Sequence, residues 1–503
     1  MSIEKLDNLR YNMKTITQQI ISLINERMEI AKRIGEIKQE MSLNIIDDKV
    51  EQEIKNFILK ESDKKGLDPE FIGRIINLLI SESIKIQTSE INKINQINNI
   101  NKVNDNVFFK EIEKNDPPSH SNNIFSDLKI KTHMDVFNKA KQLDSLGQKI
   151  IHMEVGEPDF SPPFQVKDEL CLIYDKQKYH YTETAGINNL RRKLAIYLTN
   201  LIDNKKNSEI HPENIIATVG GRFAIFCTFS SMLKPGDEII VIEPAWPAYK
   251  DIANYLGAKA KIIKTNLHER WEPDISLLEN SINVNTKIIC LNYPNNPTGK
   301  ILDEKKLESI VDLARKNNLL ILSDEVYCNF AYQKFTSILK FQYEKSIMIG
   351  SFSKTYSMTG FRVGFAYSLD KNLINKINKV QSLSLTSVAE PMQYCALAAL
   401  SYNPIEYTNI MKKRIDFVCS KLNNTPFEFI YPDGAMYVFA KINEKLAIDD
   451  LSLIEKLLQK GVAIAPGSGF GETYKNYIRI STCIDEEKLN KGLDIINQMV
   501  TSL

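Results

Sequence analysis

The stretch SIMIGSF (residues 346–352) is a short, mostly apolar run that leads into GSFSKTYSMTGFRVG (350–364). From about residue 123 onward similar runs recur, and amphipathic segments with helical spacing separate them. The other runs are IIATV (215–219), EIIVI (238–242), KIICLNY (287–293) and LLILSDEV (319–326). Because short runs rich in valine and isoleucine that alternate with helices are typical of buried parallel strands, the sequence predicts an α/β sheet.

Lys354 lies just beyond one of these runs, where the carboxyl ends of parallel strands gather ligand groups. Partial desolvation at a strand end lowers the pKa of an amine and makes it a nucleophile toward aldehydes. A lone lysine at such a place is more often a surface residue. Asp324, however, ends the run LLILSD, and a buried aspartate needs a cationic partner. A protonated pyridine nitrogen would serve, and its ring would act as an electron sink.

Further polar residues near strand ends fit the same chemical group. Tyr327 and the amide of Asn296 can reach a phenolic oxygen on such a ring. Trp246 in EPAWPAY can stack on the ring, although plain core packing also explains it. A phosphate group can be held by Ser351, by Arg362 and by the backbone N–H groups around Gly220, Gly221 and Arg222.

Residues 1–87 have the spacing of helices rather than strands. Apolar residues recur in steps near 3.6 up to about residue 42, which predicts one long helix whose apolar stripe needs a partner. Two shorter helices are predicted over 49–62 and 69–87. The segment that follows is dominated by Asn, Ile and Lys, and we interpret residues 91–122 as a flexible linker, with a weak helix as the alternative.

Polar residues in this helical region form a pattern of their own. Arg27 and Lys38 are about three turns apart and share a helix face, whereas Arg10 lies roughly a quarter-turn away and would point to a different site. Two pairs have i, i+4 spacing, namely Asp47 with Glu51 and Ser83 with Gln87. Charge on a long helix is usually only a solvated face, so the spacing alone favours no function.

The composition narrows the class of protein. The chain has 503 residues with 64 basic and 63 acidic side chains, so its charge gives no reason to expect nucleic-acid or membrane binding. No apolar run approaches the roughly 18–20 residues of a membrane helix, and the charged start MSIEKLDNLRYNMK is unlike a signal peptide. Seven scattered cysteines without a CxxC pair favour a reducing cytosol and no metal site. We therefore expect a cytoplasmic enzyme.

The segment from about 123 to 503 resembles the class I/II pyridoxal-phosphate aminotransferases of fold type I. The motifs that carry the resemblance run in order through most of it: MEVGEPDF (153–160), YTETAG followed by LR (181–191), ATVGGRFAIF (217–226), LNYPNNPTG (291–299), LSDEVY (322–327), GSFSKTYSMTGFRVGFA (350–366), YPDGAMYVF (431–439), APGSGFG (465–471) and YIRIS (477–481). The resemblance implies a large domain with a mostly parallel sheet, a smaller α+β domain, and pyridoxal 5'-phosphate as cofactor.

The resemblance also implies roles for single residues. Lys354 would be the Schiff-base lysine, and Asp324 the partner of the ring nitrogen. Arg479 would clamp the substrate α-carboxylate, and Gly156 would contact substrate as well. Tyr181 would approach the cofactor phosphate of the neighbouring subunit, which implies a homodimer.

The N-terminal helices resemble the all-helical chorismate mutases of the AroQ class. The segments LRYNMKTITQQIISLINERMEIAKRIGEIK (9–38), IIDDKVEQEI (45–54) and LLISESIKIQ (78–87) carry this resemblance. By resemblance, Arg27 and Arg10 would bind the carboxylates of chorismate, with Arg10 reaching the other subunit's site. Lys38 and Gln87 would bond the ether oxygen, and Asp47, Glu51 and Ser83 would position the ring. The rearrangement to prephenate needs only a compact conformer and positive charge near the breaking ether bond.

Together the two resemblances predict a bifunctional enzyme of phenylalanine and tyrosine biosynthesis. Residues 1–90 would convert chorismate to prephenate, and residues 123–503 would transfer an amino group from an amino acid donor to prephenate or an arylpyruvate. Arg222 stands where many relatives have a lysine, and it either meets a distal substrate carboxylate or is a solvated residue at a helix start.

Val50 stands where the mutases usually have an arginine, and this departure keeps a second hypothesis open. In that hypothesis the chain is an aspartate or aromatic aminotransferase whose helical domain serves only dimerisation or effector sensing. A transcription regulator with an aminotransferase-like sensor is a third reading, but no helix-turn-helix is evident.

Overall fold

The computed structural model describes residues 2–41, 48–68, 132–202 and 210–502, together with residues 72, 73, 75, 76, 79, 80, 82–84, 86 and 87. The chain divides into two compact units, Met1–Ser119 and His120–Leu503. The predicted linker over 91–122 lies outside the described residues.

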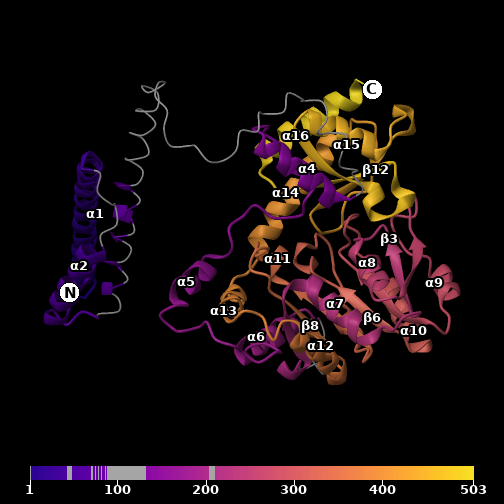
Figure 1. Ribbon diagram of the computed structural model, residues 1–503, viewed down its shortest axis with the longest axis horizontal. Coiled ribbons are helices and arrows are strands. Elements are labelled where there is room, and N and C mark those ends of the chain that lie inside the picture. Colours follow the sequence, from indigo (N-terminus) through magenta and orange to yellow (C-terminus); the bar gives the residue numbers. More distant parts are fainter. Residues whose placement is uncertain are drawn as a thin grey trace, which may run out of the picture. The chain divides into compact units, whose positions relative to one another are not determined.

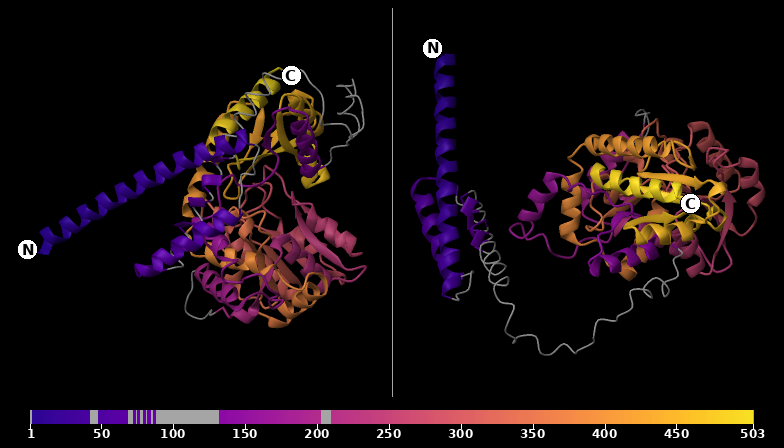
Figure 2. Two further views of the ribbon diagram at one scale, coloured as in Figure 1. Left: turned by 60° about the vertical axis from the view of Figure 1, so that its left-hand side comes forward. Right: turned by 90° about the horizontal axis from the view of Figure 1, so that it is seen from above.

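The N-terminal unit is helical. α1 (Ser2–Glu40) is a single long helix, unbroken along its length in Figure 2, and α2 (Asp48–Lys64) follows it. The described residues between 72 and 87 are helical as well. This segment packs closely on α1, because a Cβ at Gly35 would lie 3.0 Å from the Cα of Gln87. Other residues along the apolar stripe of α1, such as Ile16 and Ile20, stay exposed in the single chain.

The C-terminal unit is built on a seven-stranded sheet in the order β2-β8-β7-β6-β5-β3-β4. All five predicted runs form strands of this sheet. Every neighbouring pair is parallel except the two pairs made by β8, which runs antiparallel to β2 and β7. The strands are β2 (Ile215–Thr218), β3 (Glu238–Glu243), β4 (Lys259–Lys264), β5 (Thr286–Asn292), β6 (Leu320–Asp324), β7 (Ser346–Ser351) and β8 (Gly364–Tyr367).

Helices cover both faces of this sheet (Figure 1), because successive strand residues point to opposite sides. Along β5, Ile289 and Leu291 enter one apolar core, whereas Ile288 and Cys290 enter the other. The first core is closed by α6 (Asn188–Asn200), α10 (Glu304–Lys316) and α13 (Glu390–Ala399). The second core is closed by α7 (Gly220–Met232), α8 (Ala248–Tyr255) and α12 (Lys371–Ser384).

A second sheet of five strands has the order β1-β11-β12-β10-β9, and only β1 and β11 pair in parallel. Its strands are β1 (Ile151–Met153), β9 (Phe427–Phe429), β10 (Tyr437–Ile442), β11 (Val462–Pro466) and β12 (Tyr477–Ser481). The helices that pack on it are α4 (His133–Ser145), α14 (Ile405–Leu422), α15 (Asp450–Gln459) and α16 (Glu486–Thr501). The other α-helices in the described part of this unit are α5 (Phe164–Leu172), α9 (Ile275–Ser281) and α11 (Phe352–Thr355). The expected fold class, a helical domain plus a larger and a smaller sheet domain, is confirmed.

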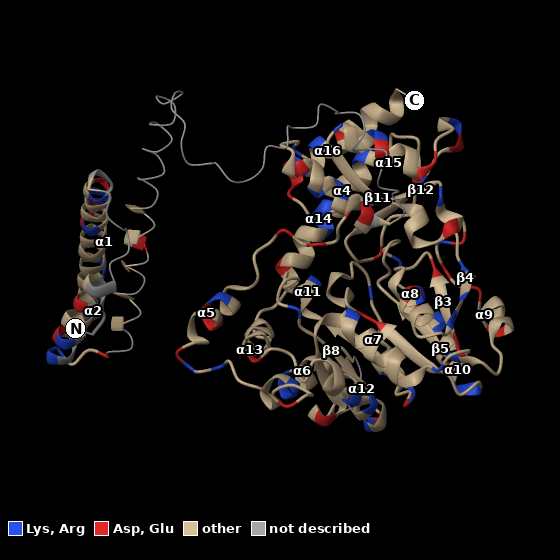
Figure 3. Ribbon diagram, viewed as in Figure 1, with Lys and Arg blue, Asp and Glu red and all other residues tan. Residues whose placement is uncertain are grey.

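Basic and acidic residues are interspersed over the C-terminal unit (Figure 3), in keeping with the near-zero net charge. Within the described ranges, no helix is both long enough and apolar enough to cross a membrane. The same residues contain no group of three or more His, Cys, Asp or Glu side chains that could hold a metal ion.

Candidate active sites

The carboxyl edge of the large sheet carries a cavity of about 290 Å³. β5, β6 and β7 end there at Asn292, Asp324 and Ser351, and β12 of the small sheet contributes Arg479. The predicted residues that line this cavity are Gly156, Gly221, Arg222, Trp246, Asn296, Asp324, Tyr327, Ser351, Lys354, Arg362 and Arg479. Tyr181 is not among them, and its side chain is 92% exposed.

Lys354 lies in the short helix α11, one turn beyond the end of β7. Its Nζ donates a hydrogen bond to the carbonyl oxygen of Gly156. Burial lowers the pKa of Lys354, and the nearby cations Arg479 and Arg362 lower it further, although Glu157 acts in the opposite sense. The amine is therefore easier to deprotonate than a surface lysine, which suits a nucleophile and a proton carrier.

Asp324 is 4% exposed at the end of β6. Its Oδ2 accepts a hydrogen bond of 2.5 Å from the hydroxyl of Tyr249, and its Oδ1 accepts one of 3.4 Å from the backbone N–H of Val326. Burial raises the pKa of Asp324 to about 6. Because these partners are a phenol and an amide rather than a cation, the carboxylate fits a protonated ring nitrogen in the cavity.

One end of the cavity has the features of a phosphate site. α7 begins there without a side-chain cap, so its first backbone N–H groups remain for a ligand. Gly220 has φ +72°, and a Cβ at this position would lie 2.7 Å from Nη2 of Arg362. Ser351 stands beside them, although its Oγ also accepts a hydrogen bond from the N–H of Ser353 at 3.1 Å. A helix N-terminus, a guanidinium and a hydroxyl together fit a phosphate group.

Arg222 and Trp246 form one wall of the cavity. The guanidinium carbon of Arg222 lies 4.6 Å from the centroid of the Trp246 ring, while the arginine itself stays exposed to solvent. The tryptophan ring meets Tyr249 edge-on, with 5.5 Å between centroids. Arg222 is therefore held over the ring surface at the cavity opening, where it can meet a second negative group of a ligand.

Arg479 is 1% exposed and lies between two aromatic rings, those of Tyr437 at 4.3 Å and Phe470 at 4.8 Å. Its Nη1 donates to Oδ1 of Asn296 at 2.9 Å, and its Nη2 donates to the carbonyl oxygen of Glu154. Its Nε has no hydrogen-bond partner. A guanidinium that is oriented by neutral acceptors and has an unused N–H fits a carboxylate ligand.

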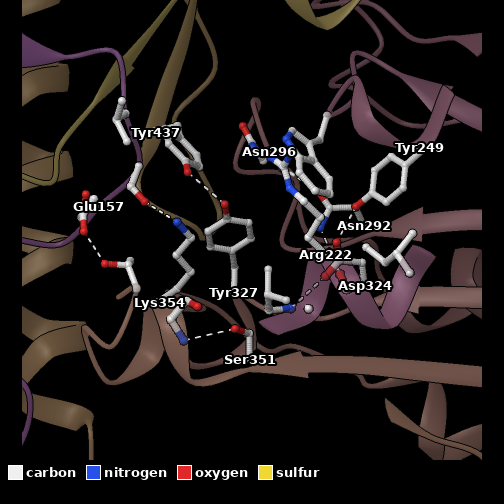
Figure 4. Close-up of a pocket in the computed structure, with 18 of the residues that line it drawn as sticks. Glu157, Arg222, Tyr249, Asn292, Asn296, Asp324, Tyr327, Ser351, Lys354 and Tyr437 are labelled. Carbon is white, nitrogen blue, oxygen red and sulfur yellow. Dashed lines mark hydrogen bonds between the residues drawn. The ribbon is translucent and has the colours of Figure 1, made fainter. Parts of the chain in front are cut away.

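Sequence reasoning missed three residues of this site, Tyr249, Asn292 and Tyr437. Asn292 donates to the backbone oxygen of Asp324 at 3.0 Å, and the hydroxyl of Tyr437 lies 2.9 Å from that of Tyr327. All three lie in motifs whose importance in the sequence rests on other residues, and their partners lie in distant segments of the chain, which motif spacing does not reveal. Figure 4 shows the two tyrosine hydroxyls facing each other.

The helical unit holds a second cavity. Its lining includes Arg27, Lys38, Ser83 and Gln87 together with Val50 and isoleucines of α1, α2 and the segment after them. Gln87 is buried and its Oε1 has no hydrogen-bond partner, and neither has Nε of Arg27.

The other residues predicted for the mutase site either do not line this cavity or are not described. Arg10 is on α1 but outside this lining, as its place on the helix predicts. Asp47 lies outside the described residues, and the Glu51 side chain is not described either.

Two family models match the chain. Residues 148–496 match aminotransferase class I and II, and residues 9–88 match chorismate mutase type II. The chain therefore belongs to the class I and II aminotransferases and joins such a domain to an N-terminal chorismate mutase domain. Both resemblances are confirmed. The protein is an enzyme, a transaminase of a family that depends on pyridoxal phosphate.

Curated relatives and solved structures agree with this assignment. An aspartate aminotransferase of Thermotoga maritima is 34% identical over 381 residues, which cover 75% of this chain and 98% of the relative. A probable aspartate/prephenate aminotransferase of Aquifex aeolicus is 32% identical over 75% of this chain and 98% of its own length. The crystal structure of aspartate aminotransferase from Thermotoga maritima superimposes with a TM-score of 0.70 at 33% identity, covering 75% of this chain and 99% of that one.

Proposed function

We propose that the chain is a bifunctional, cytoplasmic, homodimeric enzyme of phenylalanine and tyrosine biosynthesis. Residues 1–90 convert chorismate to prephenate, residues 91–122 are a linker, and residues 123–503 transfer an amino group to a keto acid of the same pathway. The observation that carries the proposal is the presence of both cavities in one chain, one lined by Arg27, Lys38 and Gln87 and the other by Lys354, Asp324 and Arg479.

The residues of the large cavity fit pyridoxal phosphate. Asp324 would hold its ring nitrogen, Tyr327 and Asn296 its phenolic oxygen and Trp246 its ring face. The phosphate would lie among the backbone N–H groups of Gly221 and Arg222, the hydroxyl of Ser351 and the guanidinium of Arg362, which leaves the Arg222 side chain for the substrate. When bound, the cofactor supplies a ring that accepts the electron pair left when the substrate Cα–H bond breaks. Lys354 Nζ takes that proton from Cα, while Arg479 holds the α-carboxylate and Gly156 lies beside it.

The keto acid is best argued from Arg222. Prephenate carries a second carboxylate, and a guanidinium at the cavity opening can bind it in bidentate fashion. Phenylpyruvate and 4-hydroxyphenylpyruvate lack this group. A relative named as a probable aspartate/prephenate aminotransferase supports prephenate as the acceptor and arogenate as the product.

The helical cavity suits the chorismate rearrangement without a cofactor. Arg27 and Lys38 place positive charge on one face of α1, and Gln87 presents an unused amide oxygen nearby. Negative charge develops on the ether oxygen in the transition state, and positioned cations stabilise it.

Two features support the homodimer. Tyr181 is fully outward on a loop that internal hydrogen bonds hold in place, since the N–H of Ile187 donates to Gln393 and that of His180 to Glu390, each at 2.7 Å. A loop that is held by internal hydrogen bonds and displays an exposed tyrosine fits a role in the partner's cofactor site. The exposed apolar residues of α1 support a second helical unit packed against this one.

The test is the kcat/KM of the full-length enzyme, loaded with pyridoxal phosphate and supplied with glutamate or aspartate, on prephenate and on the two arylpyruvates. We expect a strong preference for prephenate that Arg222→Ala removes while activity on arylpyruvates remains. Preference for the arylpyruvates in the unmodified enzyme would place the aminotransferase at the last step of the pathway and contradict the role of Arg222.

The second candidate function is an aminotransferase whose helical domain only dimerises or senses an effector. Val50 favours it, because an apolar residue lines the cavity where the mutases usually have a cation. Loss of chorismate on addition of the full-length protein would reject this candidate, provided that Arg27→Ala stops the loss and Lys354→Ala does not.

A further inference from the structure

Three ionisable side chains, those of Asp144, His152 and Glu154, connect α4 to the end of β1. The carbonyl oxygen of Glu154 accepts a hydrogen bond from Arg479 in β12. His152 in β1 has Nε2 2.8 Å from Oδ2 of Asp144, and Nδ1 2.8 Å from Oε1 of Glu154. Asp144 lies in the last turn of α4, and Glu154 follows β1 directly. Because a neutral imidazole has one N–H, only the protonated ring can donate to both carboxylates at once.

The positive charge of protonated His152 is important because its partner Glu154 is buried. The Glu154 side chain is fully buried, at 0% exposure, and its Oε2 has no hydrogen-bond partner, so His152 is the group that compensates its charge. The hydrogen bond to Glu154 raises the pKa of His152 above its usual value, although burial acts against this. From α4, Lys141 faces Asp144 at 4.0 Å, and β11 places Ala463 opposite His152.

The cluster does not line the large cavity, but its elements reach the cavity in two places. The carbonyl oxygen of Glu154 accepts the hydrogen bond from Nη2 of Arg479, and α4 contributes Met134 to the cavity lining. A shift of the main chain at Glu154 therefore changes an acceptor that orients the Arg479 guanidinium.

We propose that protonated His152 is a positioning residue for carboxylate binding at Arg479. Without the imidazolium charge, Glu154 would be an uncompensated buried carboxylate, which is strongly unfavourable. The strand end must then move, and this movement shifts the carbonyl group of Glu154 that accepts the hydrogen bond from Arg479. This inference rests on the proposed role of Arg479 as the carboxylate clamp.

The expected pH dependence follows from the direction of the shift. A histidine whose pKa is raised in the folded protein is charged at low pH and loses its charge as the pH rises through that pKa. Carboxylate affinity should therefore fall as the pH rises through the pKa of His152. The hydrogen bonds described for Lys354 and Asp324 go to residues outside the cluster. At a given pH, His152→Gln should therefore change turnover at saturating substrate much less than it changes carboxylate affinity.

The experiment measures the dissociation constant of 3-phenylpropionate, a carboxylate without an amino group, on the full-length loaded enzyme between pH 6 and pH 9. Binding is followed by the absorbance of the bound cofactor. We expect the unmodified enzyme to lose affinity on the order of tenfold or more over this range. His152→Gln should bind weakly at every pH, and His211→Gln, which removes an exposed histidine before β2, should behave like the unmodified enzyme.

The histidine itself can be observed directly. The chain has six histidines, so the NMR signal of His152 in protein with labelled histidine is identified by its absence from His152→Gln. Its midpoint should coincide with the loss of affinity. Glu154→Gln, which keeps the side-chain shape, should move the His152 midpoint to lower pH. Because no buried carboxylate then loses its partner, the variant should also remove most of the pH dependence of affinity, and it serves as the test if His152→Gln does not fold.

Two results would overturn the inference. One is an affinity profile that His152→Gln leaves unchanged, and the other is a His152 midpoint that does not match the affinity change. Binding of 3-phenylpropionate that Arg479→Lys does not weaken would contradict the role of Arg479 itself. The experiment thus distinguishes failure of this inference from failure of the proposed function.

Discussion

At the residue scale, Asp324 is a buried carboxylate whose negative charge is available to a cationic ligand in the cavity. The side chain ends a parallel strand, accepts hydrogen bonds from Tyr249 and Val326, and is shielded from water. These donors keep the carboxylate in place, but they do not cancel its charge. A cation bound in the cavity therefore meets a fixed negative group in a medium that screens it weakly.

We predict that Asp324→Asn lowers transaminase turnover by roughly 10²–10³-fold, because the negative charge that holds a protonated ring nitrogen is lost. In the unmodified cofactor-free protein the pKa of Asp324 is raised to about 6, so the charge is present above that pH and absent below it. The affinity advantage of the unmodified protein over the variant for pyridoxal phosphate should therefore shrink as the pH falls through about 6. Spectroscopic titrations of both proteins measure this difference, and a constant difference would contradict it.

Val50 is the residue whose replacement tests the mutase domain. It lines the helical cavity, and the mutases usually have an arginine there. We predict that Val50→Arg raises the kcat/KM for chorismate by roughly tenfold or more, because it adds a cation near the developing negative charge. The control is Phe57→Arg, which adds the same charge on an exposed position of α2 outside the cavity. Equal effects of the two substitutions would mean that net charge, not the site, is responsible.

At the scale of single elements, the start of α7 depends on a glycine. Gly220 adopts a positive φ, and the missing side chain leaves room for Arg362 beside the helix N-terminus. We predict that Gly220→Ala weakens retention of pyridoxal phosphate, because it displaces that guanidinium, and also costs roughly 1–3 kcal/mol of backbone strain.

Gly236 offers a matched control for this substitution. It also has a positive φ, of +92°, but a Cβ there would meet nothing within 4 Å. Gly236→Ala should lower the melting temperature and leave cofactor affinity unchanged. Equilibrium dialysis of the cofactor and thermal unfolding separate the two effects, and loss of cofactor from both variants would show that strain alone is enough.

The elements of the chain were predictable to different degrees. Strands β2, β3, β5, β6 and β7 could be predicted because each is buried on both faces and so reads as a continuous apolar run. β4, an edge strand with three lysines in its sequence KAKIIK, has no such run. The loops that place Asn296 and Trp246 could be recognised only through their family motifs, because loop conformation depends on distant contacts.

At the scale of the whole molecule, the position of Tyr181 can be tested with mixed dimers. Lys354→Ala and Tyr181→Ala subunits are each expected to be poor enzymes as homodimers. A hybrid dimer pairs one Lys354→Ala subunit with one Tyr181→Ala subunit. If Tyr181 completes the partner's site, one of the two sites in this hybrid has both its own Lys354 and the tyrosine from the other subunit intact. Random mixing after co-expression should then restore transaminase activity to about a quarter of that of the unmodified enzyme. No recovery in purified hybrids would place Tyr181 outside the partner's site.

The sequence by itself determined the local features of this protein: the helical period of the N-terminal region, the buried strands, and the identity of Lys354 and Asp324 as chemically notable residues. Arg479 could be recognised only through the family motif YIRIS. These features depend on residue spacing and residue type, which are properties of the linear chain. Only the tertiary structure decided which residues meet: Tyr437 with Tyr327, Tyr249 with Asp324, and His152 with Asp144 and Glu154. Such contacts arise because packing of two sheets brings distant strand ends together, and neither periodicity nor motif spacing records which ends will be neighbours.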